Sequence, residues 1–419
     1  IFNSLIWGPD GWLYGCNGIQ SRSFVAKPGT PMKDRTEFNC GVWRYHPTRK
    51  VFEPFAHGTT NPFGLDYDEY GEFFMTNCVI KHLFHVIPGG HFDRMYGQDV
   101  NPNVYKLMPS IADYIHWAGG DWTSSRGNKP EHSDAGGGHA HSGAMVYLGD
   151  NFPDEYRNTL FTCNIHGNRL NRDVLKRHGS GYKAERAKDF MFANDPWFRG
   201  IAIHYGPDGG VFVSDWCDTG ECHNYDKVDV TNGRIHKIVY GKPKAWKGDL
   251  SKLNVGELVD LLSHKNHWFV RHARRLIIER TELAMYPGKV ENDLVNLFKR
   301  PEEHLHLLQV VWTLHAVGHS LGAHQLQGFR QAEEAIRAAG VRMTAAGMPE
   351  GFAYSVREKN FGTGCLPERM ALASCISQLE PGKRVALLPT LIDSIEKKDI
   401  EDAFFPLMVW YAIEPTVGL

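Results

Sequence analysis

The sequence predicts a partial β-propeller followed by an α-helical solenoid of the HEAT or ARM type, a multidomain β and α fold class that three observations support. The first half repeats a unit of short strand, tight turn and short strand. The second half places its apolar residues at helical spacing. Between the halves the composition changes, since 31 of the 43 glycines lie among the first 248 of 419 residues. We therefore expect a propeller over residues 1–245 and helical repeats over residues 246–419.

The repeated unit of the first half is an apolar strand, a turn with Asp or Glu close to Gly, and a second apolar strand. Glycine permits the positive φ that such turns require. Close copies are Leu5–Gly15, Leu65–Thr76 and Ile203–Ser214, and Ala144–Cys163 is a looser copy. The long gaps between copies favour antiparallel blades around an axis over a single sandwich. Because only about four copies are visible and an open ring leaves strand edges unprotected, we expect a propeller that is cut at its N-terminus.

The second half predicts amphipathic helices, and one of them shows two clearly different faces. Its apolar face consists of Phe269, Ala273, Leu276 and Ile277. Its basic face contains Arg271, Arg274 and Arg275. We expect this basic face to be solvated, with docking of a partner protein as the alternative. No polar capping repeat precedes Leu419, so we expect a solenoid that is cut at its C-terminus.

Composition excludes several classes of protein. The net charge of -2 gives no general attraction to nucleic acid or to an anionic membrane. No run of about 18 apolar residues occurs, so we expect no transmembrane segment. The eight cysteines form no CxxC pair and no CxxCH motif, so we expect no haem site in this chain. Cys217 and Cys222 flank a short polar loop that fits a disulfide or two free thiols, and zinc ligation together with His223 is a third alternative.

Five segments carry a resemblance to a known family. They are Asn3–Gly15, His57–Leu65, Gly138–Gly143, Asn164–Arg169 and Gly206–Trp216. The chain resembles the membrane-bound dehydrogenase family of planctomycetes and verrucomicrobia. The resemblance implies a propeller similar to the quinoprotein glucose and sorbosone dehydrogenases, followed by HEAT-type repeats. It also implies a cytochrome c module, which is often present in that family and is absent from this chain.

The same resemblance implies a function and a location. The protein would oxidise a sugar or an alcohol with pyrroloquinoline quinone and calcium, and would pass the electrons to the cytochrome c domain. It would be exported, to the periplasm or to a membrane surface. Two positions differ from the quinoprotein relatives. Their basic histidine would stand one residue before Ile1, and Thr60 occupies the place of an arginine that helps to hold the quinone.

Three residues are candidates for catalysis. His139 and His141 lie in a glycine-rich segment with i, i+2 spacing, which places both rings on one face of a strand. One of them could act as the base, or both could ligate a metal, and two ordinary surface histidines are the alternative. Arg199 directly precedes a predicted strand and could bind an anionic group of substrate or cofactor with two hydrogen bonds. A salt bridge between blades is the alternative for Arg199.

Further residues are candidates for binding a cofactor. Asn61 and Gly64 could present an amide and bare backbone to the central channel, and a strand-entry turn is the favoured alternative. Trp117 and Trp122 have Gly and Ser neighbours and could stack on a sugar or quinone ring. The other tryptophans of this half are expected mostly to pack within the blades: Trp12, Trp197 and Trp216.

Asp215 and Asp218 follow a predicted strand and are candidate calcium ligands, with the capping of a turn as the alternative. Together these candidates favour a dehydrogenase that acts on a sugar or an alcohol. Two other functions stay open. One is a scaffold that binds a glycan on the ring or a protein partner on the helical repeats, and the other is a metal-dependent lactonase.

Overall fold

A computed structural model of the chain describes residues 2–78, 81–114, 138, 140–217, 219, 229–282, 294, 304–319, 332–347, 352, 356 and 363–417. Among these residues the last strand ends at Ile238 and the first α-helix begins at Val255. The expected boundary after residue 245 therefore falls between the strands and the α-helices. No helix within the described part is both long enough and apolar enough to cross a membrane.

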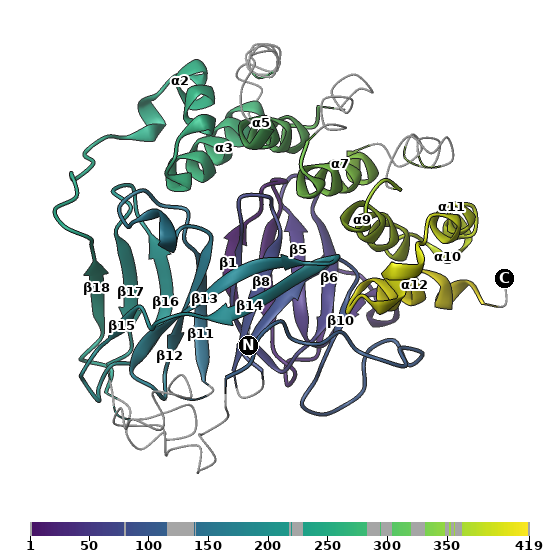
Figure 1. Ribbon diagram of the computed structural model, residues 1–419, viewed down its shortest axis with the longest axis horizontal. Coiled ribbons are helices and arrows are strands. Elements are labelled where there is room, and N and C mark those ends of the chain that lie inside the picture. Colours follow the sequence, from purple (N-terminus) through teal and green to yellow (C-terminus); the bar gives the residue numbers. More distant parts are fainter. Residues whose placement is uncertain are drawn as a thin grey trace.

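The first half forms four antiparallel sheets that lie side by side, which we call blades 1 to 4 (Figure 1). Blade 1 contains β1 (Phe2–Trp7), β2 (Leu13–Asn17), β5 (Gly41–His46) and β6 (Val51–Gly58). Blade 2 contains β7 (Asn61–Tyr67), β8 (Phe73–Cys78) and β9 (Leu83–Val86). Blade 3 contains β11 (His141–Val146), β12 (Thr159–Asn164), β13 (Arg169–His178) and β14 (Gly181–Arg186). Blade 4 contains β16 (Gly200–Tyr205), β17 (Val211–Asp215) and β18 (Arg234–Ile238).

Each predicted strand–turn–strand unit forms the first hairpin of one blade, so the arrangement fits the predicted partial propeller. Four shorter strands supplement the blades: β3 (Ser23–Val25), β4 (Thr36–Phe38), β10 (His91–Phe92) and β15 (Met191–Phe192). β3 and β4 pair with each other, β10 runs parallel to β6, and β15 lies antiparallel to β13.

The first strand of every blade has the same irregularity. Its pairing with the second strand shifts register between Asn3 and Ile6, Pro62 and Leu65, Ser142 and Met145, and Gly200 and Ala202. A bulge of this kind bends a strand and increases its twist. Because the shift recurs near the beginning of all four strands, the blades are structural copies of one unit despite their different lengths.

Two glycines allow neighbouring blades to approach closely. Gly64 of β7 faces β11, and a Cβ atom at this position would lie 2.6 Å from the Ala144 backbone nitrogen and even closer to Gly143 and to the Thr76 hydroxyl. Gly143 has a φ of +65° and faces Ile201 and Ala202 of β16. The absence of a side chain at these two glycines therefore lets β7, β11 and β16 pack closely, because a larger residue at either position would push the strands apart.

The core runs continuously from the blades into the helices. All six residues of β11 and all six of β12 are buried, which explains why these strands lack an exposed polar face. The same apolar cluster contains Phe74 of blade 2, Phe161 of blade 3 and Phe405 of the helical half. The two halves are thus packed as one body.

The second half consists of helices that follow one another in an arc around the blades (Figure 1). They are α2 (Val255–Asp260), α3 (His267–Glu282), α5 (His304–Ala316), α7 (Glu334–Gly347), α9 (Leu366–Ser377), α10 (Pro381–Arg384), α11 (Leu388–Asp393) and α12 (Phe405–Ile413). Helix α2 begins with a capping box, in which Asn254 and Glu257 each bond the backbone of the other. Assignment of these helices to HEAT or ARM repeats stays a prediction.

The expectation that the basic face of α3 is solvated was wrong, because Arg271 and Arg275 contact the propeller and Arg274 donates to Gln309 and Thr313 of α5. Arg271 donates to Asp66 Oδ1 at 2.8 Å and to the Tyr67 carbonyl at 2.9 Å. The Arg275 guanidinium lies 3.6 Å from the centre of the Trp7 ring. These contacts fasten the helices to the turn end of blades 1 and 2, where the first strands end.

Glycine turns at this end lie against the helices. Gly11 faces Ala316 and Ile278, and Gly71 faces Trp312. The concave side of the helical arc is therefore filled by the chain's own blades. We call the opposite end of the blades, where the first strand of each blade begins, the open end.

His57 makes the folded state sensitive to acid. It lies at the end of β6, with its ring stacked on His91 at 5.1 Å. Burial, aided by the neighbouring His91, lowers the pKa of His57 to about 4. In the unfolded chain His57 takes up a proton near pH 6.5, whereas in the folded chain it does so only near pH 4. The free energy of unfolding therefore decreases as the pH falls from about 6.5 to 4.

We expect this residue to account for about 3 kcal/mol of the stability lost between pH 7 and pH 4. In His57→Gln the free energy of unfolding should fall by about 3 kcal/mol less than in the wild type between pH 7 and pH 4. His178→Gln, at an exposed position, should show the same pH dependence as the wild type. Urea unfolding at pH 7, 5 and 4 measures the difference. Equal acid slopes for wild type and His57→Gln would contradict the assignment.

Candidate functional site

Polar side chains gather at two places at the open end of the blades. One lies on blade 4, where Asp215 ends β17 and Arg199 precedes β16. Asp215 Oδ1 accepts hydrogen bonds from the backbone nitrogens of Arg199 at 2.8 Å and Cys217 at 2.9 Å. Its Oδ2 accepts from Arg234 Nε at 2.8 Å and His236 Nε2 at 2.9 Å. Asp215 is therefore the polar centre of this end of blade 4.

Arg199 and Asp215 were predicted to bind a ligand or a metal, but their polar atoms already form hydrogen bonds within the protein. Arg199 Nη1 donates to the carbonyls of Pro196 and Phe198, both at 2.8 Å, so its guanidinium holds backbone. Calcium binding by Asp215 would require its protein donors to give way, and Asp218 lies outside the described residues. Within the described ranges, no three His, Cys, Asp or Glu side chains are grouped to hold a metal ion.

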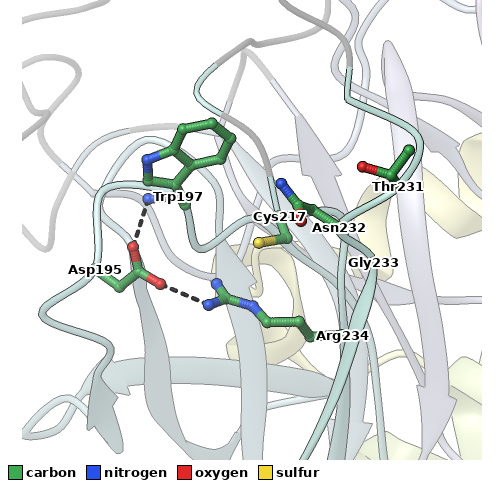
Figure 2. Close-up of a pocket in the computed structure, with 7 residues that line it drawn as sticks. All are labelled: Asp195, Trp197, Cys217, Thr231, Asn232, Gly233 and Arg234. Carbon is green, nitrogen blue, oxygen red and sulfur yellow. Dashed lines mark hydrogen bonds and ion pairs between the residues drawn. The ribbon is translucent and has the colours of Figure 1, made fainter.

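Beside Arg234, which donates to Asp215, lies a surface cavity of about 500 Å³ (Figure 2). Cys217 lines it as a free thiol, and Cys222 lies outside the described residues. Trp197 also lines it and is 40% exposed, and Trp216 is 52% exposed. The expectation that most of these tryptophans pack within the blades therefore holds for Trp12, which is buried, and was wrong for these two.

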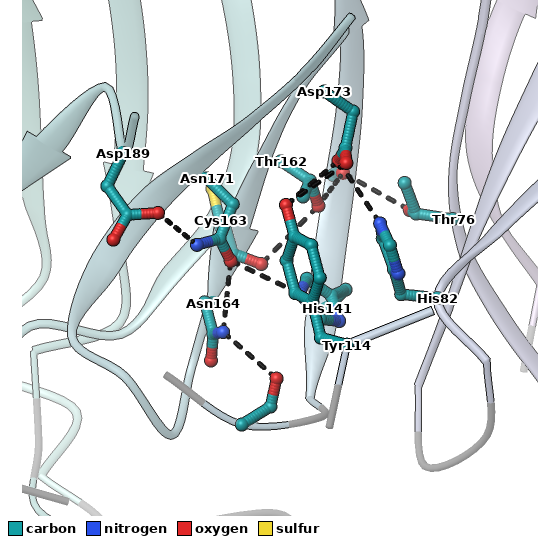
Figure 3. A network of polar contacts seen from close by, with 12 residues as sticks. Thr76, His82, Tyr114, His141, Thr162, Cys163, Asn164, Asn171, Asp173 and Asp189 are labelled. Carbon is teal, nitrogen blue, oxygen red and sulfur yellow. Dashed lines mark hydrogen bonds and ion pairs between the residues drawn. The ribbon is translucent and has the colours of Figure 1, made fainter. Parts of the chain in front are cut away.

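The second polar group lies between blades 2 and 3 (Figure 3). It is built on β13, where Arg169, Asn171 and Asp173 occupy every second position and are all 0% exposed. Alternation along a strand directs these three side chains to one face. That face turns toward His82, which lies between β8 and β9, and toward His141 at the start of β11.

Asp173 is the acceptor at the centre of this group. His82 Nε2 lies 3.1 Å from Asp173 Oδ2, and the Tyr114 hydroxyl donates to both carboxylate oxygens at 3.1 Å. The rings of His82 and Tyr114 are stacked at 4.1 Å. Burial, together with the charge of Asp173, raises the pKa of Tyr114 well above 10, so the phenol keeps its proton and donates it.

This arrangement determines which nitrogen of His82 carries the hydrogen. A carboxylate only accepts hydrogen bonds, so His82 Nε2 must donate and Nδ1 holds the lone pair. Nδ1 is buried and has no hydrogen-bond partner among the described residues. Leaving a buried polar atom unpaired costs about 1–3 kcal/mol, so a water, an ion or a ligand that meets this nitrogen would be favoured.

His141 extends the group on the other side of His82. Its ring lies 4.7 Å from the His82 ring, and its Nε2 donates to Asn171 Oδ1 at 3.2 Å. Asn171 in turn donates to Asp189 at 2.7 Å. The structure therefore brings the predicted His141 into a polar cluster, whereas His139 lies outside the described residues.

Three of the positions linked to quinone binding lie at the entry to β7 or within it. The Asn61 backbone nitrogen donates to Asn77 Oδ1 at 2.8 Å, and Gly64 is enclosed between two strands. Thr60 is 1% exposed, and its hydroxyl accepts from the Met95 nitrogen at 3.1 Å. The predicted stacking residues Trp117 and Trp122 lie outside the described residues.

Sequence reasoning missed His82, Tyr114 and Asp173. One signal was available, because polar residues at alternate positions of a strand, at 169, 171 and 173, predict a polar face. It could not identify the partners, because His82 and Asp173 are 91 residues apart. Only the packing of blade 2 against blade 3 brings them together.

Comparison with known proteins gives a family and several distant structures. Residues 1–242 match a family described as "Domain of unknown function (DUF7133)". No curated protein matches the chain. Similar solved structures include the PQQ-bound aldose sugar dehydrogenase of Streptomyces coelicolor, at 16% identity and a TM-score of 0.35 over 57% of this chain and 62% of that one. A glucose dehydrogenase of Thermus thermophilus gives 16% identity and a TM-score of 0.34 over 57% and 66%. The chain thus spans just under two thirds of the length of these proteins.

Proposed function

The chain belongs to the DUF7133 family, and we propose that its propeller half oxidises a hydroxyl group of a sugar or an alcohol with His82 as the general base. The observation that carries this proposal is the His82–Asp173 pair, with Nδ1 of His82 buried and unpaired among the described residues. An imidazole aligned by a carboxylate through one nitrogen can take a proton at the other.

The proposed reaction separates a proton from a hydride. His82 Nδ1 takes the hydroxyl proton as the C–O bond becomes a carbonyl. The adjacent C–H bond would give up a hydride, and with it two electrons, to a quinone supplied as a separate oxidant, as in the assay below. Asp173 stabilises the imidazolium that forms, and Tyr114 keeps the carboxylate in place with its hydroxyl. The product is an aldehyde, a ketone or a lactone, and His82 later releases its proton to water.

The remaining parts of the proposal follow the family resemblance. Electrons would pass onward to a cytochrome c domain or to a separate acceptor, and the protein would be exported to the periplasm or a membrane surface. The helical half would hold blades 1 and 2 in place relative to each other, since Arg271 contacts Asp66 of blade 2 and Arg275 contacts Trp7 of blade 1.

A dye-linked oxidation assay tests the proposed activity. Purified protein is mixed with a panel of aldoses and primary alcohols, a soluble quinone and a dye that bleaches on reduction. We expect bleaching that requires both protein and one class of substrate, with typical turnover of about 1–10³ per second. Absence of bleaching with every sugar and alcohol, in protein that keeps a cooperative thermal transition, would contradict the proposal.

A further inference from the structure

The cavity on blade 4 is separate from the His82 cluster. It is an open depression in the surface with a volume of about 500 Å³, within the range of about 300–1,000 Å³ that small-molecule sites occupy. Its lining combines one aromatic side chain, Trp197, with the polar side chains of Asp195, Asn232 and Arg234 (Figure 2). None of these side chains belongs to the group around Asp173. The cavity therefore has its own chemistry.

The charged groups at the cavity are paired with one another. Arg234 Nη1 lies 2.8 Å from Asp195 Oδ2, and its Nη2 lies 2.7 Å from the buried Asp215 Oδ2. The guanidinium is thus clamped between two carboxylates and is not available to neutralise a bound anion. A bound anion would meet two carboxylates and an arginine that is already paired, so the lining disfavours an anionic ligand, and its remaining donors and acceptors suit a neutral one.

Trp197 is held at the edge of the cavity by the same carboxylate. Asp195 Oδ1 accepts from the Trp197 backbone nitrogen at 2.8 Å, which sets the loop that carries the indole. The side chain is 40% exposed although burial of an indole is strongly favourable. A flat apolar surface left partly in water beside hydrogen-bonding groups suits a ligand with one apolar face and many polar edges.

We propose that this cavity binds a neutral carbohydrate, with Trp197 stacking against the sugar ring. The C–H groups on one face of a pyranose are apolar and fit an indole, while its hydroxyls both donate and accept. Asp195 has accepting capacity beyond its bonds to Trp197 and Arg234, since a carboxylate has about four lone-pair sites. Asn232 donates through Nδ2 to Asp229 at 2.7 Å, and its second amide hydrogen and its oxygen can meet sugar hydroxyls.

The test is binding of cellobiose, a neutral disaccharide, measured by calorimetry and by saturation-transfer NMR. Wild-type protein should bind cellobiose and should not bind glucuronate at the same concentration. Trp197→Ala should weaken cellobiose binding by about tenfold or more, because it removes the stacking surface. Asn232→Ala should weaken it as well.

Trp216→Ala is the matched control, because Trp216 is also exposed on blade 4 but does not line the cavity. It should bind cellobiose like the wild type. The dye-linked assay is run on the same variants, so that loss of oxidation and loss of sugar binding are recorded as separate results. No saturation transfer from wild-type protein, or equal affinities for wild type and Trp197→Ala, would overturn the proposal.

Discussion

Replacing His82 by glutamine is expected to lower kcat for the proposed oxidation by about 10²–10⁴-fold, with little change in KM. Glutamine approximates the size of the imidazole and can still donate to Asp173, but it cannot take a proton at neutral pH. The loss should therefore fall on the proton-transfer step and spare substrate binding. Steady-state kinetics in the dye-linked assay measure both constants.

The pH profile separates a catalytic from a merely structural role of His82. A base in the free enzyme produces an acidic limb in the dependence of kcat/KM on pH, and this limb should be absent from the residual activity of His82→Gln. His178→Gln, at the exposed end of β13, is the matched control and should keep the full rate and the limb. If His82→Gln retained wild-type kcat, His82 could not be the base. Thermal unfolding of each variant shows whether the fold is intact.

Replacing Gly64 by alanine is expected to destabilise the protein by about 3 kcal/mol or more, because the new methyl group overlaps the backbone of β11. The overlapping atoms belong to Gly143 and Ala144, which cannot rotate away as a flexible side chain would. Blades 2 and 3 would have to separate, and the His82–Asp173 pair spans that same junction. Urea unfolding at pH 7 measures the loss.

Gly382→Ala is the matched control, since a methyl group there meets nothing within 4 Å and the residue lies in helix α10. It should leave stability unchanged or raise it by about 0.5–1 kcal/mol, because alanine is the better helix former. The comparison also decides between two roles for Gly64. A glycine needed only for cofactor approach would tolerate alanine without loss of stability, which would contradict the packing role.

The hairpins of the blades were predictable because their causes are local. A turn with Asp or Glu close to Gly determines where a strand reverses, as at Gly11 and Gly71, and both glycines have positive φ. The amphipathic pattern around Ala273 likewise predicted helix α3. These signals involve residues a few positions apart, so the chain does not need to be folded for them to be read.

The basic face of α3 shows where local reasoning fails. Its arginines look like a solvated stripe, because charged residues on a helix opposite an apolar face are usually exposed. Arg271 instead lies against Asp66, 205 residues earlier in the chain. A pattern along one helix contains no information about the charge on a distant strand, so the outcome was decided by docking.

The candidate site likewise contains one residue that was predicted from local sequence and others that were not. His141 was predicted from its glycine-rich surroundings and does enter the polar cluster at the open end. Its neighbours His82 and Tyr114 were not predicted, since neither stands in a recognisable motif. Both come close to Asp173 only after blade 2 has packed on blade 3.

From its residue order alone, this chain determined its repeating hairpins, its change from strands to helices and one histidine of its polar cluster. The reason is that turn geometry and helical periodicity depend on near neighbours. The tertiary structure alone decided that a carboxylate, an imidazole and a phenol meet in the buried interior, and that an indole stays at the surface of blade 4. Those outcomes depend on close packing between segments far apart in the chain, where burial changes the behaviour of each polar group.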